Sequence, residues 1–340
     1  MKSGHQTLVS FNAIHNTQKV TGARLYQYRL PFAQPLFFNS FRLKAREGFF
    51  LQLQFNDHSV GWGEASPLPG FSLETMAQCQ QDLTQFMNTI DGSKSKTYYR
   101  AQTPAAQFAI DCALNQIPIH PLSLEPSMVP LLQGTKQQVI EQYKTLGKPM
   151  RIKLKVARQP VDDDIALLTK LGHINPRLKC HLDANQGWTK KQAWCFLANV
   201  SRSLIEVVEE PCQAFEQSLT LAQKFHIRLA IDESLFSYPW QHGLPAEVST
   251  VIVKPSLIGG FKQLIKLIET AKKGQQTLYF SSSFESPLAL SQIVSIAQMW
   301  ADDASLGLDT LKYFQQQHTL KKANIVDFIN GTDVNLIWQK

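Results

Sequence analysis

The chain has few cysteines and no long apolar run, and both absences narrow the kind of protein it can be. Its five cysteines form no CxxC motif and no Cys/His cluster, which argues for reduced thiols rather than disulfides or a zinc site. No apolar stretch approaches the ~18 residues that a membrane span needs. The first twenty or so residues contain no continuous apolar segment typical of a signal peptide. We therefore expect a cytoplasmic protein that does not bind a membrane.

Long runs of positive charge are also absent, although 34 lysines and arginines outnumber 27 aspartates and glutamates. The longest basic runs are pairs such as Lys190-Lys191 and Lys272-Lys273, which are typical of solvated helix faces. This scatter argues against a nucleic-acid partner. The net charge of +7 is compatible with a small anionic substrate but does not identify one. A monomer and a small homo-oligomer both remain open.

The N-terminal part of the chain is predicted to be an α+β domain. Residues 24–30 alternate as a strand does, and residues 49–55 and 60–64 flank a turn and predict a hairpin. Helical periodicity follows to about residue 90 and again over 104–115. Strands followed by helices are typical of an α+β unit. We expect an extension over residues 1–22 and a capping domain over 23–126.

From about residue 127, short apolar runs end in a polar residue, and each is followed by a helix-like stretch. This alternation predicts βα units and a parallel sheet. Seven such runs favour a TIM-type barrel, and the absence of GxGxxG and Walker A sequences argues against a nucleotide-binding fold. The runs are 128–132, 150–156, 179–183, 204–209, 229–232, 251–254 and 277–281. We expect a modified (β/α)7β barrel over 127–313, with 314–340, including a strand-like run at 323–326, packing back on the capping domain.

Charged and polar residues stand where these predicted strands end. From Lys155 to Ser281, successive strand-end residues are separated by 22 (254 − 232) to 28 (183 − 155) residues, which is about one βα unit. In a parallel barrel such residues converge on the mouth at the C-terminal ends of the strands. They are Lys153, Lys155, Asp183, Glu209, Asp232, Lys254 and Ser281.

Three of these residues, Asp183, Glu209 and Asp232, are carboxylates that would repel one another if buried together. A hard divalent cation removes the repulsion, and an all-oxygen set suits Mg²⁺. Any one of them could instead cap the following helix, but three in successive units favour a metal site. His181 lies two residues before Asp183, so we expect it on the same strand face, one layer deeper.

The lysines complete the predicted site. Lys153 and Lys155 are at i and i+2 of one strand, so both side chains point to the same face, and neighbouring ammonium groups lower each other's pKa. A solvated edge strand would also tolerate this pair, but Lys254 is expected to face it across the carboxylates. A metal between lysines suits abstraction of a proton α to a carboxylate.

Several motifs at these positions resemble the enolase superfamily and, within it, the o-succinylbenzoate synthase family, dehydratases of menaquinone synthesis. The resemblance runs from about Arg24 to the C-terminal segment. The superfamily motifs are Lys153-Leu154-Lys155, Leu182-Asp183-Ala184-Asn185, Glu209-Glu210-Pro211, Ile231-Asp232-Glu233-Ser234 and Val253-Lys254-Pro255. The motifs that point to the synthase family lie at 61–71, 281–286 and 307–310.

The resemblance implies a role for each site residue. Asp183, Glu209 and Asp232 match ligands of Mg²⁺, with Mn²⁺ as a substitute, and Asn185 and Glu233 lie just outside them. Lys155 matches the base that removes the α-proton and then protonates the departing hydroxyl. Lys254 matches a charged lysine that stabilises the enediolate, and Lys153 a partner that tunes Lys155. Ser281 and the Gly307 backbone match positions near the succinyl end of the substrate, and the loop before Phe49 matches a cap over the pocket.

Two alternative functions and three departures from the family pattern remain. Racemisation of N-succinylamino acids, or another isomerisation, can use the same two lysines. A non-catalytic barrel that serves as a scaffold would have no need of the intact polar set. Pro287 and Ala289 stand where we expect serine and glycine, and His181 stands where some relatives carry arginine. We expect Pro287 and Ala289 to change the pocket wall.

Overall fold

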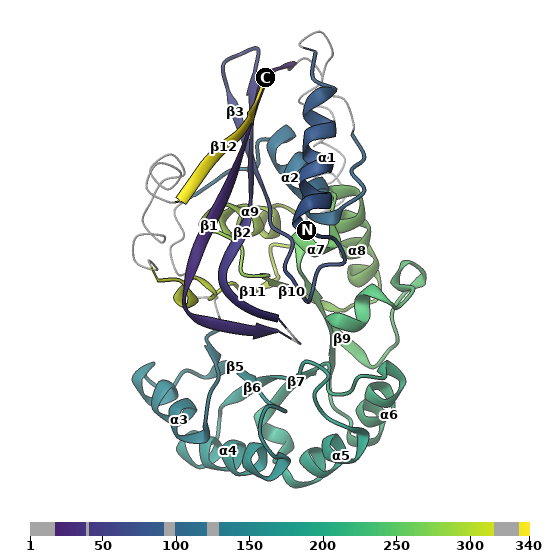
Figure 1. Cartoon of the computed structure of the whole chain (residues 1–340). Helices are drawn as coiled ribbons and strands as arrows, with labels where there is room; N and C mark the ends of the chain where they lie inside the picture. The colour runs from purple at the N-terminus through teal and green to yellow at the C-terminus, as the bar shows by residue number, and fades with distance from the viewer. Residues whose placement is uncertain (1–17, 39–40, 92–98, 121–128, 316–332) are drawn as a thin grey trace.

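The protein consists of an N-terminal sheet with two helices and a C-terminal barrel of parallel strands (Figure 1). The computed structural model describes residues 18–38, 41–91, 99–120, 129–315 and 333–340. The expected boundary at residue 126 and the strand-like run at 323–326 lie outside these residues. The arrangement confirms the predicted combination of an α+β domain and a modified barrel. In the described part of the chain, no helix has the length and apolar character to cross a membrane.

The N-terminal sheet is antiparallel and has the order β12-β1-β2-β3. Its strands are β1 (Val20–Phe38), β2 (Phe41–Phe55), β3 (Val60–Ala65) and, from the end of the chain, β12 (Asp333–Gln339). The helices α1 (Met76–Asn88) and α2 (Pro104–Leu114) cover one face. Thr75 is the N-cap of α1, and its side chain accepts a hydrogen bond from the Gln78 backbone in a capping box.

Both long strands extend further than the sequence predicts. β1 continues through Pro31 and Pro35 to Phe38, and β2 begins at Phe41 rather than near Phe49. β12 pairs with β1 only over residues 24–29, so the later part of β1 is an edge where a proline loses no ladder hydrogen bond on that side. The pairing with β2 shifts register between Pro31 and Leu36. In Figure 1 the two strands run from the upper sheet towards the barrel.

Close contact between β3 and α2 depends on two glycines. A Cβ atom at Gly61 would lie 1.9 Å from the carbonyl oxygen of Ala113, and one at Gly63 would lie 1.9 Å from that of Ala109. Since both neighbours are backbone atoms of a helix, no side chain fits there. The Gly61-Trp62-Gly63 sequence therefore sets how closely the helix packs on the sheet.

The barrel contains eight parallel strands in the order β4 to β11. They are β4 (Leu131–Leu132), β5 (Arg151–Lys155), β6 (Lys179–Asp183), β7 (Ile205–Glu209), β8 (Leu229–Ile231), β9 (Val248–Val253), β10 (Thr277–Ser281) and β11 (Ser305–Gly307). β11 was not recognised from the sequence because three residues carry too little periodicity. The backbone N–H of Val129 donates to Leu306 at 3.4 Å, so β4 and β11 nearly close the barrel.

Helices connect most of the barrel strands on the outside. They are α3 (Lys136–Thr145), α4 (Val161–Ile174), α5 (Lys190–Asn199), α6 (Phe215–Phe225), α7 (Pro255–Ile258), α8 (Phe261–Lys273) and α9 (Pro287–Trp300). The connection from β8 to β9 instead carries two 3-10 helices, Glu233–Phe236 and Trp240–His242. Another short 3-10 helix, Leu311–Tyr313, follows β11. The barrel thus departs from a regular βα repeat directly after the strand that leads to Asp232.

A partly buried carboxyl group from α2 joins the two domains. Asp111 Oδ2 accepts a hydrogen bond from the backbone N–H of Phe261, the first residue of α8, at 2.7 Å. Its Oδ1 accepts from Gln107 Nε2 at 2.9 Å. A carboxylate at a helix N-terminus is favourable, but burial opposes its ionisation. A Cβ atom at Gly260 would lie 2.9 Å from Asp111, so this glycine makes room for the contact.

Replacing Asp111 with Asn tests this link through its pH dependence. Burial raises the pKa of Asp111 from 3.8 to about 6, so between these values the folded protein keeps a proton that the unfolded chain releases. The stability from this group is complete below the unfolded pKa and is lost as the pH rises through the folded one. We expect urea denaturation to show the parent protein losing about 1 to 3 kcal/mol more than Asp111→Asn between about pH 4 and pH 7. An identical pH dependence in both proteins would contradict this role.

Candidate active site

A cavity of about 880 Å³ lies at the C-terminal ends of the barrel strands, and both domains form its wall. Leu36, Leu68 and Phe71 contribute from the N-terminal part of the chain. The predicted site residues that line it are Lys153, Lys155, Asp183, Asn185, Glu209, Lys254, Ser281 and Gly307. Asp232 and Glu233 lie outside this lining. The spacing of strand-end residues thus brings most of the predicted residues to one opening.

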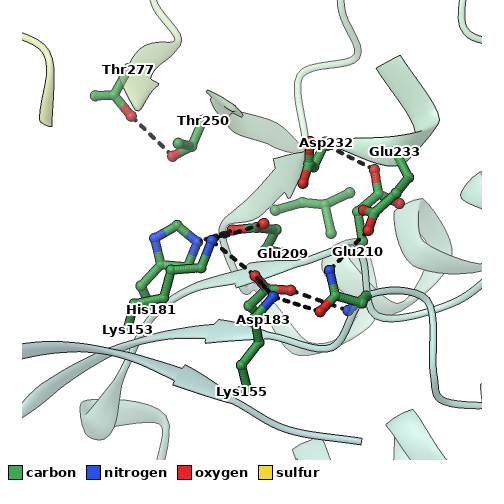
Figure 2. A network of polar contacts seen from close by, with 12 residues as sticks. Lys153, Lys155, His181, Asp183, Glu209, Glu210, Asp232, Glu233, Thr250 and Thr277 are labelled. Carbon is green, nitrogen blue, oxygen red and sulfur yellow. Dashed lines mark hydrogen bonds and ion pairs between the residues drawn. The ribbon is translucent and has the colours of Figure 1, made fainter. Parts of the chain in front are cut away.

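Lys153 is the centre of the buried charge cluster (Figure 2). Its Nζ donates to Glu209 at 2.7 and 3.0 Å and lies 2.9 Å from Asp183 Oδ2. Burial lowers the pKa of Lys153, but attraction to Asp183 and Glu209 outweighs it and leaves the pKa well above its usual value. His181 Nε2 lies 2.5 Å from Glu209 Oε2. Burial and the nearby Lys153 lower the pKa of His181 to about 3, so the imidazole is neutral.

Lys155 differs from its neighbour on the same strand. Its Nζ donates to Asp183 Oδ2 and to Asn185 Oδ1, both at 2.6 Å. Both lysines line the cavity, and the side chain of Lys155 is the more exposed, at 15% against 9%. Burial, with repulsion from Lys153, holds the pKa of Lys155 below its usual value despite Asp183. Of the two, Lys155 gives up its proton more readily.

Lys254 approaches from β9, on the other side of the carboxylates. Its Nζ donates to Asp232 Oδ2 at 2.5 Å and lies 5.3 Å from the centre of the Phe71 ring. Burial lowers the pKa of Lys254, but attraction to Asp232 exceeds this effect and raises the pKa above its usual value. The side chain is therefore a fixed cation, with an aromatic face from the capping domain above it.

Negative charge is crowded around the predicted metal ligands. Burial and Asp183 raise the pKa of Glu209 to about 8, and burial and Asp232 raise that of Glu233 to about 8. Glu233 Oε2 is buried without a hydrogen-bond partner among the described residues. A hard divalent cation matches such a set of carboxylate oxygens. The chemistry of the three expected ligands therefore fits Mg²⁺.

The ligands are not yet gathered around one point. Within the residues that the structure describes, no three His, Cys, Asp or Glu side chains have the arrangement of a metal site. Asp183 and Glu209 contact the lysines of β5, and Asp232 contacts Lys254. An ammonium group satisfies each carboxylate in this arrangement. A cation held by all three carboxylates would compete with the lysines for these oxygens.

Asn185 and Glu233 link the two sides of the cluster. Asn185 accepts from Lys155 and donates from Nδ2 to Glu233 Oε1 at 2.9 Å. Its φ of 43° is in the left-handed region, which asparagine tolerates better than most residues. The amide therefore fixes Lys155 relative to the turn that follows β8.

Glu210 is a positioning residue that sequence reasoning missed. Its Oε1 accepts from the backbone N–H groups of Asp232 and Ser234, both at 2.8 Å, and its Oε2 accepts from Ser234 Oγ at 2.7 Å. These bonds hold the turn that carries Asp232 and Glu233. The signal in the sequence is the pair Glu209-Glu210 at the end of β7, in which only Glu209 was given a role.

A second missed group, Glu64 on β3, lies at the N-terminus of α9. It accepts hydrogen bonds from Tyr28 Oη at 2.6 Å, from the backbone N–H of Ser286 at 3.0 Å and from that of Ala289 at 3.2 Å. The Ser286 hydroxyl also donates to it. Four donors and a helix N-terminus stabilise a buried carboxylate. Glu64 thereby ties the capping domain to the 281–286 segment of the cavity wall.

Arg46 makes the complementary link. Its guanidinium is buried, with 1% exposure, and donates to the carbonyl oxygens of Phe284 at 3.2 Å and Pro67 at 2.7 Å. It also donates to the carbonyl of Ser66. One arginine thus holds the 66–68 segment, which brings Leu68 to the cavity, and the barrel segment around Phe284.

Pro287 and Ala289, the departures expected to change the pocket wall, do not line the cavity. Pro287 is the first residue of α9, and Ala289 donates to Glu64 through its backbone. The expected change of the pocket wall is therefore not direct. Gly307 has a steric role in addition to its predicted one, because a Cβ atom there would lie 2.3 Å from the Tyr279 ring.

Comparison with known proteins was made by sequence and by structure. A family model described as "MenC, N-terminal domain" matches residues 20–117, and one described as "Enolase C-terminal domain-like" matches residues 137–328. The chain is 32% identical over 300 residues to the o-succinylbenzoate synthase of Enterobacter sp. (strain 638), covering 87% of this chain and 92% of the relative. It is 29% identical over 320 residues to that of Pectobacterium atrosepticum, covering 93% and 98%.

Solved structures agree with these sequence matches. The o-succinylbenzoate synthase from Thermosynechococcus elongatus BP-1, complexed with Mg in its active site, superimposes with a TM-score of 0.71 at 25% identity. The match covers 86% of this chain and 94% of that one. The N-succinyl Arg/Lys racemase from Bacillus cereus has a TM-score of 0.74 at 18% identity, covering 95% and 99%, and this likeness concerns the fold alone.

The variant Glu64→Gln tests the link between the domains and the cavity wall. The amide keeps the shape of the side chain but presents a donor to groups that themselves donate. We expect the free energy of unfolding to fall by about 2 to 4 kcal/mol, measured by urea denaturation. The control is Glu47→Gln, at an exposed carboxylate 3.6 Å from Arg29, where we expect a change within about 0.5 kcal/mol. Equal effects of both substitutions would contradict the assignment.

Proposed function

The chain belongs to the o-succinylbenzoate synthase family of the enolase superfamily, and we propose that it performs the dehydration for which this family is named. The substrate is 2-succinyl-6-hydroxy-2,4-cyclohexadiene-1-carboxylate, and the products are o-succinylbenzoate and water. The reaction is a carbon–oxygen lyase step of menaquinone biosynthesis. The observation that carries the proposal is the pair of unlike lysines, Lys155 and Lys254, on opposite sides of buried carboxylates.

We propose that Mg²⁺ is held by Asp183, Glu209 and Asp232, with Mn²⁺ as a substitute. When bound, the ion would hold the ring carboxylate of the substrate and offset the charge that develops on it as the α-proton leaves. Burial and the nearby Asp183, which raise the pKa of Glu209, support this donor set. Glu210 contributes by holding the turn of Asp232.

Lys155 is the proposed acid–base residue. The lowered pKa of Lys155 favours a neutral amine that accepts the proton from the carbon next to the ring carboxylate. The same proton then passes from Nζ to the departing hydroxyl, so the C–O bond breaks, water leaves and the ring becomes aromatic. One group on one face can perform both transfers, which is a syn elimination. Asn185 orients Nζ for them.

Lys254 and Lys153 are proposed to remain charged. The raised pKa of Lys254 suits a cation that stabilises developing negative charge on the substrate. Racemisation of N-succinylamino acids requires Lys254 to exchange protons as readily as Lys155 does, and the opposite pKa shifts of the two lysines argue against this. Dehydration, which needs one base, is therefore the better match. Ser281 and the Gly307 backbone are proposed to contact the succinyl end.

The variant Lys155→Ala tests the assignment of the base. We expect the rate of dehydration, followed by ultraviolet absorbance, to fall by at least about a hundredfold to ten-thousandfold. The melting temperature and the binding of Mg²⁺ by calorimetry should stay near those of the parent protein, because three carboxylates remain. Substantial residual turnover would rule out Lys155 as the sole base.

Removal of the metal tests the carboxylate set independently. We expect EDTA to abolish dehydration reversibly and Mg²⁺ to restore it, since Lys254 alone would otherwise stabilise the charge that develops on the substrate. Addition of Mn²⁺ in place of Mg²⁺ tests the proposed substitute. An activity that persists in excess chelator would contradict the proposed role of Asp183, Glu209 and Asp232.

A further inference from the structure

One cationic side chain of the cavity stands apart from the others. The lining carries the cations Lys153, Lys155, Arg158, Lys254 and Lys312. All four lysines lie within 3 Å of a carboxylate oxygen, including Lys312, which is 2.6 Å from Asp309. Over the described ranges of the chain, Arg158 has no carboxylate within ion-pair distance, and its hydrogen-bond partner is the neutral amide of Gln133, 2.9 Å from Nη1. Arg158 is an exposed residue, so its guanidinium can be reached by an anionic ligand.

The Arg158 side chain is nevertheless held in place. Gln133, which follows β4, accepts from Arg158 through Oε1 and donates from Nε2 to Tyr313 Oη at 2.8 Å. Tyr313 follows β11, so these bonds cross the seam where the barrel nearly closes. The backbone before Arg158 is fixed as well, because the N–H of Ala157 donates to Asp164 Oδ2 at 2.8 Å.

Arg158 lines the same cavity as the proposed base Lys155. It is three residues after Lys155, so the two Cα atoms are at most about 11 Å apart. Ser281 and Gly307 are neighbours on β10 and β11, and the seam with Gln133 continues this wall towards Arg158. A ligand whose reacting carbon lies at Lys155 can extend along this wall to the guanidinium.

We propose that Arg158 binds the second carboxylate of the substrate, at the end of its succinyl chain. This inference rests on the proposed function, because that substrate carries one carboxylate on the ring and one on the chain. A guanidinium has five N–H donors in a planar fork, and Gln133 uses one of them, which leaves donors for a carboxylate. Lys312 is unsuited to this role because Asp309 and the Leu131 carbonyl already occupy its ammonium group.

The test compares two ligands on three proteins. The ligands are o-succinylbenzoate and 2-butanoylbenzoate, in which a methyl group replaces the distal carboxylate. The proteins are the parent, Arg158→Gln and the charge-matched control Lys170→Gln, at an exposed position of α4 that does not line the cavity. Binding is measured by calorimetry in the presence of Mg²⁺, with the melting temperature as a check on folding.

We expect Arg158→Gln to weaken o-succinylbenzoate about tenfold and to leave 2-butanoylbenzoate unchanged, since a partly exposed charged hydrogen bond is lost only with the first ligand. The control should affect neither ligand. In turnover assays KM should rise about tenfold with kcat nearly constant, because the reacting groups are untouched. The variant Arg158→Lys, which keeps the charge but not the fork, should restore part of the affinity.

Equal weakening of both ligands by Arg158→Gln, or no weakening of either, would overturn the role of Arg158. That result is distinguishable from failure of the proposed function. If the parent protein turns over the cyclohexadiene substrate but does not discriminate between the two ligands, only the Arg158 inference fails. If it neither turns over that substrate nor binds o-succinylbenzoate, the proposed function fails and this inference fails with it.

Discussion

Burying a charged group costs several kcal/mol unless an opposite charge lies close to it, and this protein buries a cluster of both signs at one end of its barrel. Lys153, Asp183, Glu209, Asp232 and Lys254 are all at most 9% exposed. Each ammonium group lies against a carboxylate, and burial together with the remaining excess of negative charge raises the pKa of Glu209 and Glu233. The same excess suits the site to a divalent cation. The pKa of Lys155 is lowered by burial and by repulsion from Lys153, against the attraction of these carboxylates.

The two domains are joined by the same physical means. Glu64 and Asp111, both from the capping domain, accept hydrogen bonds from the first turns of α9 and α8, where backbone N–H groups lack partners within the helix. Arg46 donates to carbonyl groups of both domains. Since buried polar contacts are costly to break, these links fix the 66–68 and 281–286 segments against each other. The cavity wall is therefore defined by the domain contact as much as by the barrel.

The sequence predicted those site residues whose positions follow from the periodic spacing of the strand ends. The intervals between strand-end residues predicted that Lys155, Asp183 and Glu209 converge, and in the structure they are neighbours in register on β5, β6 and β7. It did not find Glu64 with Ser286, which are 222 residues apart, or Arg158 with Gln133 across the seam. No local pattern relates such pairs. β11, at three residues, was also too short to show a period.

The sequence by itself determined the fold class and the residues at the strand ends, because alternation and βα spacing are local properties that the chain carries directly. Its motifs, by their resemblance, indicated the family. Only the tertiary structure decided how the charges divide among partners. Lys153 and Lys155 are equivalent by spacing, yet Lys153 is held between Asp183 and Glu209 while Lys155 contacts Asp183 and Asn185. Their difference in pKa arises from burial and from neighbours that the chain brings together only on folding. Electrostatic energies depend on distances in space, and spacing along the chain does not fix those distances.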